Sequence, residues 1–178
     1  MRKLILFLAI AMTVAPASGQ AQVTIDMSRI TCANYLAMSP DQARTFSAWM
    51  SGWFNHKWGY VSVGLNDFAR NIASIKQFCT TYPQESVMAA LEGSVPQPGP
   101  VTGQIKIDMS LITCKQYSGS DAERKEMIGA WMSGYFRAST NQSNFDFQRF
   151  ANNTRSVGNY CKKNGGETLM SAIQKSAR

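Results

Sequence analysis

The sequence predicts an all-α protein made of two tandem small helical-bundle modules, each with one intramodule disulfide. Three observations lead to this prediction: a repeat at an offset of 82 residues, capping signals ahead of amphipathic segments, and four cysteines in repeated positions. The 178 residues are 44% hydrophobic and 16% charged, which is enough apolar material for packed cores and too little charge for intrinsic disorder. Because a module of about 70 residues has only a small core, a covalent cross-link is expected in each.

An export signal precedes the modules. Two cations, an apolar run over Leu4–Val14 and small residues after it are typical of a secretory signal peptide. The expected cleavage point follows Ala21, with Gly19 and Ala17 as alternatives. The competing interpretation, a retained membrane anchor, is weaker because the run is shorter than the roughly 18 residues that a span needs. We therefore expect residues 1–21 to be removed, and the mature protein to be exported to an oxidising compartment where cysteines pair.

The rest of the chain is a duplication. Aligned without a gap at the offset of 82, 22 of 68 positions are identical, which chance does not explain. The main matching segments are Ile25–Ser28 with Ile107–Ser110, Ile30–Cys32 with Ile112–Cys114, Ala48–Phe54 with Ala130–Phe136, and Cys79 with Cys161. The first module is predicted to occupy residues 22–93 and the second residues 105–178.

A linker and an uneven charge distinguish the two copies. Residues 94–104 hold three of the six prolines, so they cannot propagate a helix and favour an extended spacer. Residues 22–93 carry five basic and five acidic side chains, whereas residues 94–178 carry eleven and six. The net charge of +5 on the mature chain therefore belongs to the second module. Its cations are scattered among acids, which indicates a solvated surface and no nucleic-acid partner.

Capping signals and apolar spacing predict the helices of each module. Ser39-Pro40-Asp41-Gln42 is a capping box with proline at the first helical position, and it opens a helix that runs to about His56. The equivalent helix of the second copy begins at Ser120–Glu123. Further helices are expected over about 66–80 and, in the second copy, along the stripe from Phe150 to Cys161, with short helices at 32–38, 84–92 and 167–175. Residues 58–63 are the one stretch that alternates like a strand over a useful length, and they are interpreted as a loop.

Four cysteines allow three disulfide connectivities, and the duplication selects one of them. Because each copy must have been able to fold as a unit, Cys32 is expected to pair with Cys79, and Cys114 with Cys161. Each bond closes a loop of about 48 residues, worth roughly 4 kcal/mol in the chain-entropy model. The disulfides are therefore expected to be structural, and the absence of a C-x-x-C pair argues against redox chemistry.

The repeated Trp-Met-Ser-Gly-[Trp/Tyr]-Phe segment is the most distinctive motif. A glycine inside a helix costs about 1 kcal/mol relative to alanine, so its presence at both Gly52 and Gly134 suggests that another backbone passes close by. Core packing is the favoured interpretation for the first tryptophan of each copy, whereas the later aromatic residues are harder to bury and can form an apolar patch. The candidate binding residues are Trp49, Met50, Trp53, Phe54, Trp131, Met132, Tyr135 and Phe136.

Little in the sequence points to catalysis or metal binding. His56 is the single histidine, and near a helix C-terminus it is more simply a favourable partner of the helix dipole. No cysteine spacing suits zinc, and no pair of carboxylates is spaced for acid–base work. We expect no catalytic residue, no metal and no cofactor, and we do not expect an enzyme.

The motifs together resemble the HdeA/HdeB family of periplasmic acid-stress chaperones. The resemblance is carried by Thr31–Leu36, the aromatic Trp-x-x-Gly helix, and Phe78-Cys79 followed by Pro83, with similar segments in the second copy at Thr113–Tyr117 and Tyr160–Asn164. It implies a small all-α module with one disulfide between its first short helix and its third. It also implies a periplasmic location and a role in preventing the aggregation of unfolded or acid-denatured periplasmic proteins.

The tandem arrangement suggests how apolar surface is hidden. Members of the family are single modules that dimerise, whereas here the helices of Gly52 and Gly134 are hypothesised to bury each other within one chain, with a homodimer as the alternative.

In acid, loss of eleven carboxylate charges and protonation of His56 move the mature charge from +5 towards +17, and self-repulsion loosens the fold. Carboxylates at the starts of the aromatic helices, Asp41 and Asp121 or Glu123, are expected to make those caps acid-labile.

Other function classes fit the same features. An exported binding module, such as an immunity-type inhibitor of a periplasmic toxin, would also use a disulfide-linked helical bundle with a Gly-aromatic helix. A structural protein of the envelope is a third possibility. The sequence alone favours the acid-stress chaperone.

Overall fold

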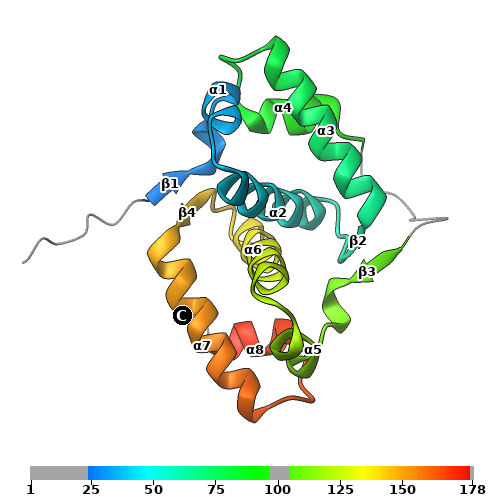
Figure 1. Ribbon diagram of the computed structural model, residues 1–178, viewed down its shortest axis with the longest axis vertical. Helices are drawn as coiled ribbons and strands as arrows, with labels where there is room; N and C mark the ends of the chain where they lie inside the picture. The colour runs from blue at the N-terminus through cyan, green and yellow to red at the C-terminus, as the bar shows by residue number, and fades with distance from the viewer. Residues whose placement is uncertain (1–23, 97–104, 177–178) are drawn as a thin grey trace, which may run out of the picture.

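The computed structural model describes residues 24–96 and 105–176, which form two modules of the same architecture (Figure 1). The first module contains β1 (Thr24–Asp26), a 3₁₀ turn η1 (Met27–Arg29), α1 (Cys32–Leu36), α2 (Pro40–Lys57), β2 (Ser62–Gly64), α3 (Leu65–Thr81) and α4 (Val87–Ser94). The second contains β3 (Lys106–Asp108), η2 (Met109–Leu111), α5 (Cys114–Gly119), α6 (Ala122–Ala138), β4 (Asn144–Asp146), α7 (Phe147–Lys163) and α8 (Leu169–Ser176). The predicted signal peptide and residues 97–104 of the predicted linker lie outside the described residues.

The helix starts follow the capping chemistry. The hydroxyl of Ser39 accepts from the backbone N–H of Gln42 at 3.3 Å, and the Gln42 side chain accepts from the N–H of Ser39 at 3.1 Å, which confirms the capping box of α2. In the second copy, the Asp121 carboxylate accepts from the N–H of Arg124 at 2.7 Å and begins α6. The two closing helices, α4 and α8, start later than predicted. The hydroxyl of Ser86 accepts from the N–H of Ala89 and that of Thr168 accepts from the N–H of Ser171, so these side chains cap the helices at the observed starts.

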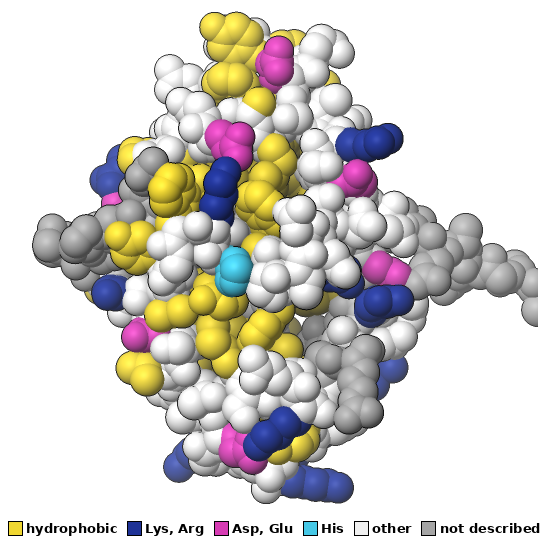
Figure 2. All heavy atoms as spheres, turned by 180° about the vertical axis from the view of Figure 1, so that it is seen from behind, with side chains coloured by type: hydrophobic (Ala, Val, Ile, Leu, Met, Phe, Trp, Pro, Cys, Tyr) yellow, Lys and Arg dark blue, Asp and Glu magenta, His cyan; other side chains and the backbone are white. Residues whose placement is uncertain are grey.

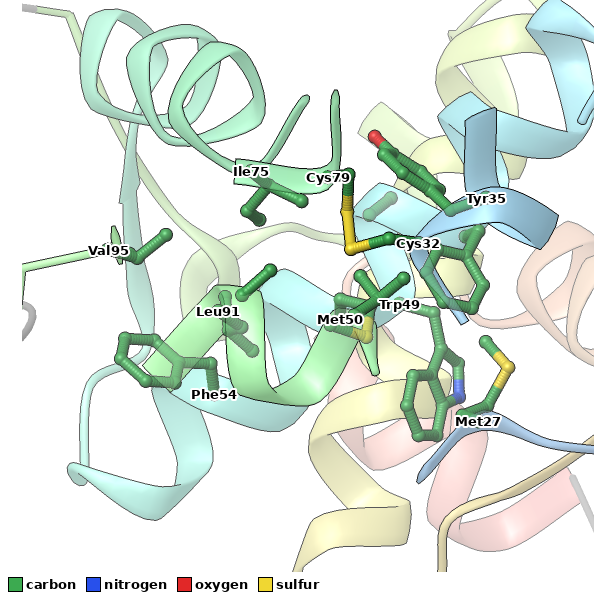
Figure 3. Packing of buried hydrophobic residues seen from close by; sticks show 14 of the residues in the cluster. Met27, Cys32, Tyr35, Trp49, Met50, Phe54, Ile75, Cys79, Leu91 and Val95 are labelled. Atoms are coloured by element: carbon green, nitrogen blue, oxygen red, sulfur yellow. A yellow bond between two sulfur atoms is a disulfide. The ribbon is translucent and has the colours of Figure 1, made fainter. Parts of the chain in front are cut away.

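Both predicted disulfides are present and lie in the module cores. Cys32–Cys79 ties α1 to α3, and Cys114–Cys161 ties α5 to α7, each across a sequence separation of 47 residues. All four cysteines are at most 2% exposed. In the first module, Ile75, Leu91 and Met50 surround the bond (Figure 3). Each module is therefore cross-linked internally and has no covalent disulfide to the other.

Short strands join the modules, and here one prediction is wrong. Residues 58–63 were expected to form a loop, but Ser62 and Val63 belong to β2, which pairs antiparallel with β3 of the second module. In the same way β1 of the first module pairs antiparallel with β4 of the second. The alternation over residues 58–63 is too short to indicate a strand by itself, and each strand of the structure has only three residues and a partner in the other module.

The two aromatic helices cross at the centre of the molecule (Figure 1). A Cβ atom added to Gly52 would overlap the carbonyl oxygen of Trp131 and lie 2.8 Å from its carbonyl carbon. One added to Gly134 would overlap the carbonyl oxygen of Trp49 and lie 2.9 Å from its carbonyl carbon. The two glycines therefore permit a reciprocal backbone contact between α2 and α6, which confirms the hypothesis that these helices bury each other.

Replacing either glycine at this crossing is expected to destabilise the protein. In Gly52→Ala and Gly134→Ala the added methyl group pushes the backbones of α2 and α6 apart. Overpacking of this kind typically lowers the free energy of unfolding by about 1–3 kcal/mol. Urea unfolding at neutral pH measures the free energy of unfolding of each variant. The matched control is Gly158→Ala in α7, where a Cβ meets nothing within 4 Å and alanine is expected to stabilise the helix by about 0.5–1 kcal/mol. Wild-type stability in Gly52→Ala would contradict the assignment of a tight crossing.

Candidate functional site

The candidate binding residues lie in and around the α2–α6 crossing. Trp49, Met50, Trp131 and Met132 are at most 3% exposed, and Phe54 is 6% exposed. Trp53, Tyr135 and Phe136 are half-buried. In this closed form the eight residues do not make an open patch, so their role as a client-binding surface stays a prediction.

Aromatic contacts at the crossing pass from one module to the other. The Trp49 ring meets the edge of Phe145 with 6.4 Å between centroids, and Tyr135 packs edge-on against His56 at 4.8 Å. Tyr135 also stacks on Trp131 of its own helix at 5.1 Å. The single histidine lies between apolar side chains gathered on both sides of it on this face of the molecule (Figure 2). His56 is thus an interface residue, whereas the sequence suggested only a helix-end role.

Each hydrophobic core includes residues from the other module. Ala130 and Phe145 belong to the buried cluster of the first module, with Phe150 packed against it, while Val63 packs against the cluster of the second. Sequence reasoning missed Phe145 and Val63 as interface residues. The sequence offers little sign of this role, because each is a single apolar residue in a short strand. The two residues occupy equivalent positions, and it is the pairing of their strands with strands of the other module that places them at the interface.

Three buried indole N–H groups at the crossing find no acceptor among the described residues. They belong to Trp49, Trp53 and Trp131. A buried donor without a partner costs about 1–3 kcal/mol relative to the same group in water. If the modules separate, water can hydrate these groups. The crossing is therefore tightly packed and holds three indole N–H groups without an acceptor among the described residues.

Carboxylates form polar contacts between the modules at the edge of the α2–α6 crossing. Glu126 accepts from the hydroxyl of Thr45 at 2.5 Å, and Glu123 lies 3.2 Å from the Arg44 guanidinium. Both bonds connect α2 to α6. Since the side chains of Arg44 and Glu123 are 37% and 62% exposed, that ion pair contributes only about 0–1 kcal/mol.

Asp26 forms the third carboxylate contact between the modules. Its Oδ1 atom accepts from the hydroxyl of Ser28 at 2.7 Å and from the hydroxyl of Ser143, in the second module, at 2.7 Å. Hydrogen bonds from Ser28 first and from Ser143 next lower the pKa of Asp26 below its ordinary value of 3.8. The equivalent carboxylate, Asp108, bonds to Ser110 in the same way, but the position equivalent to Ser143 is Val61, which has no hydroxyl.

The described residues show no other candidate centre of chemistry at this interface. All four cysteines are in disulfides, and within residues 24–96 and 105–176 no three His, Cys, Asp or Glu side chains are grouped to hold a metal ion. Among the same residues, no helix combines the length and the hydropathy needed to cross a bilayer. The site is a buried apolar contact rimmed by carboxylates.

Comparison with known proteins identifies the module. A model of the HdeA/HdeB family matches the chain twice, over residues 2–89 and over residues 90–171. No curated protein and no solved structure matches it significantly. The two matches divide the chain into halves that each contain one of the disulfides. The chain therefore belongs to the HdeA/HdeB family, as a tandem pair of its modules.

Proposed function

We propose that the protein is a periplasmic acid-stress chaperone, which at low pH binds unfolding proteins through apolar aromatic and methionine side chains and keeps them from aggregating. The observation that carries the proposal is the burial of Trp49 and Trp131 at a crossing between two separately cross-linked modules, with Met50 and Met132 buried next to them in the module cores. If the modules part, this surface becomes accessible while the disulfides limit further unfolding. Membership of the HdeA/HdeB family supports the same activity.

The charge balance gives acid a way to separate the modules. At neutral pH, residues 22–93 carry no net charge and residues 94–178 carry +5. With all carboxylates neutral and His56 protonated, the two halves carry +6 and +11. Two cationic halves repel each other across the interface, and their charge keeps the open form soluble. Clients are also cationic in acid, so binding depends on apolar contact, for which flexible methionine side chains are well suited.

Carboxylates with lowered pKa values make the folded state sensitive to acid in the same direction. In addition to Asp26, the backbone N–H of Arg124 lowers the pKa of Asp121, and a hydrogen bond from Lys175 lowers that of Glu167. A carboxylate whose pKa is lower in the folded state stabilises the fold above its unfolded pKa, and this stabilisation is lost as the pH falls through the folded pKa. The sequence led to this expectation for Asp121. Protonation of Asp121 therefore weakens the N-terminal cap of α6, and protonation of Asp26 weakens the contact with Ser143 between the modules.

Substitution of Asp26 is expected to reduce the acid dependence of stability. Asp26→Asn cannot ionise, so the variant should be less stable than wild type at neutral pH, and the difference should shrink as the pH falls below 3.8. Urea unfolding across this pH range measures both effects. Asp108→Asn is the control for the shared serine bonds, because it removes the same charge where no bond joins the modules, and Ser143→Ala removes the inter-module bond while leaving the Arg29 ion pair of Asp26 in place. An equal loss in the two aspartate variants would show that the Ser143 contact contributes nothing.

The chaperone activity is tested by light scattering of an aggregating client with the oxidised mature protein added. At about pH 2.5, below the ordinary pKa values of Asp and Glu, we expect scattering to be suppressed, and at neutral pH we expect no effect. Unchanged scattering in acid would refute the proposal. Capture of one stoichiometric partner at neutral pH would instead favour the inhibitor class.

The crossing provides a sharper form of this test. Gly52→Ala weakens the module contact, so we expect suppression of scattering to begin at a higher pH than in wild type. Gly158→Ala is the control, since it changes a helix without touching the interface. An identical onset pH in wild type and Gly52→Ala would show that client binding does not require the modules to part.

A further inference from the structure

Each module contains a cavity in the same position, lined on one side by its aromatic helix. In the first module it lies among α2, α3 and α4 and measures about 200 Å³, and in the second it lies among α6, α7 and α8 and measures about 240 Å³. Equivalent residues line both, for example Tyr35 with Tyr117 and Phe54 with Phe136. Two copies that differ at most positions retain the cavity, so it is a property of the module and not a local packing defect.

The walls of the second cavity are apolar. They are formed mainly by Tyr117, Phe136, Phe145, Phe150, Val157 and Ile173. A volume of about 240 Å³ is slightly below the roughly 300–1,000 Å³ of sites for drug-sized ligands. The cavity therefore suits a small ligand with an apolar body.

The rim of the second cavity carries two arginines that the first lacks. Arg137 and Arg149 line it, whereas the equivalent residues of the first cavity are Asn55 and Asp67. The first cavity is lined by two cations of its own, Arg70 and Lys106, but Arg70 is ion-paired with Asp67 and Lys106 is not a guanidinium. The second rim thus differs from the first in presenting two guanidinium groups.

The surroundings of Arg137 favour an anion at this rim. Arg137 is half-buried and donates to the side-chain oxygen of Gln142 at 2.7 Å. Burial and the nearby charge of Arg149 lower the pKa of Arg137, while the carboxylate of Asp146 acts in the opposite direction. Asp146 also accepts from the backbone N–H of Arg149 at 2.9 Å. Two cations face one carboxylate, so a second carboxylate would balance the charge.

We propose that the second cavity binds a small amphipathic carboxylate, a short single-chain fatty acid, with its chain among the aromatic walls and its carboxylate between Arg137 and Arg149. Guanidinium groups match carboxylates in geometry and form charge-assisted hydrogen bonds. The site belongs to the closed form at neutral pH. Octanoate binding is measured on the folded protein at neutral pH and client binding is measured in acid, so either proposal can fail without the other.

Calorimetry of the mature protein with octanoate at neutral pH tests the site. One octanoate is expected to bind per chain, and Arg137→Gln should weaken binding about tenfold, as loss of one hydrogen bond to a charged group predicts. Arg137→Lys should restore part of the affinity. Arg70→Gln, at the rim of the first cavity, is the matched control and should bind as wild type does. Binding of octanol that is insensitive to Arg137→Gln would support the role of the carboxylate.

A second variant tests the cavity itself. A Cβ at Gly129 lies 3.5 Å from the ring of Phe150, so the side chain of Gly129→Leu extends into the cavity and should abolish octanoate binding. Gly158→Leu, where a Cβ meets nothing within 4 Å, should leave binding unchanged. Thermal unfolding of each variant confirms that it is folded. No octanoate binding to wild type, or equal affinity in wild type, Arg137→Gln and Gly129→Leu, would overturn the proposal.

Discussion

The contact between the backbones of α2 and α6 at Gly52 and Gly134 is the constraint on which the rest of the structure depends. Only with hydrogen in place of a side chain can each helix approach the carbonyl group of the other's tryptophan. The same approach brings Trp49 against Phe145 of the second module, and the short strands of one module pair with those of the other. The positions of the aromatic side chains, the shared cores and the carboxylate rim all follow from it.

Neither module completes its core alone. The first takes Ala130 and Phe145 from the second, and within residues 24–96 and 105–176 each strand pairs with a strand of the other module. The disulfides act elsewhere, since they tie α1 to α3 and α5 to α7 without crossing the interface. The molecule therefore combines a covalent link within each module with a non-covalent contact between them, which is the contact that the proposed function requires to open in acid.

The features that repeat in the sequence could be predicted, and the features that join the repeats could not. Duplication selected the disulfide pairing, capping residues located the helix starts, and a glycine repeated inside a helix indicated a close backbone approach. The β2–β3 and β1–β4 pairs escaped prediction because three residues carry no period and their partners lie in the other module. Phe145, the ion pair of Arg44 with Glu123, and the two cavities are likewise products of tertiary packing.

The rim of the crossing contains an asymmetry that only a tandem chain can have. Arg44 and Glu126 occupy equivalent positions of the two copies, and both make contacts between the modules. In a dimer of identical chains each interface residue occurs twice, so one position cannot be cationic on one side and anionic on the other. Fusion of the two copies in one chain removes this restriction, so the same position can be cationic in the first module and anionic in the second. The first module can thereby recognise its own covalently attached partner in preference to another copy of itself.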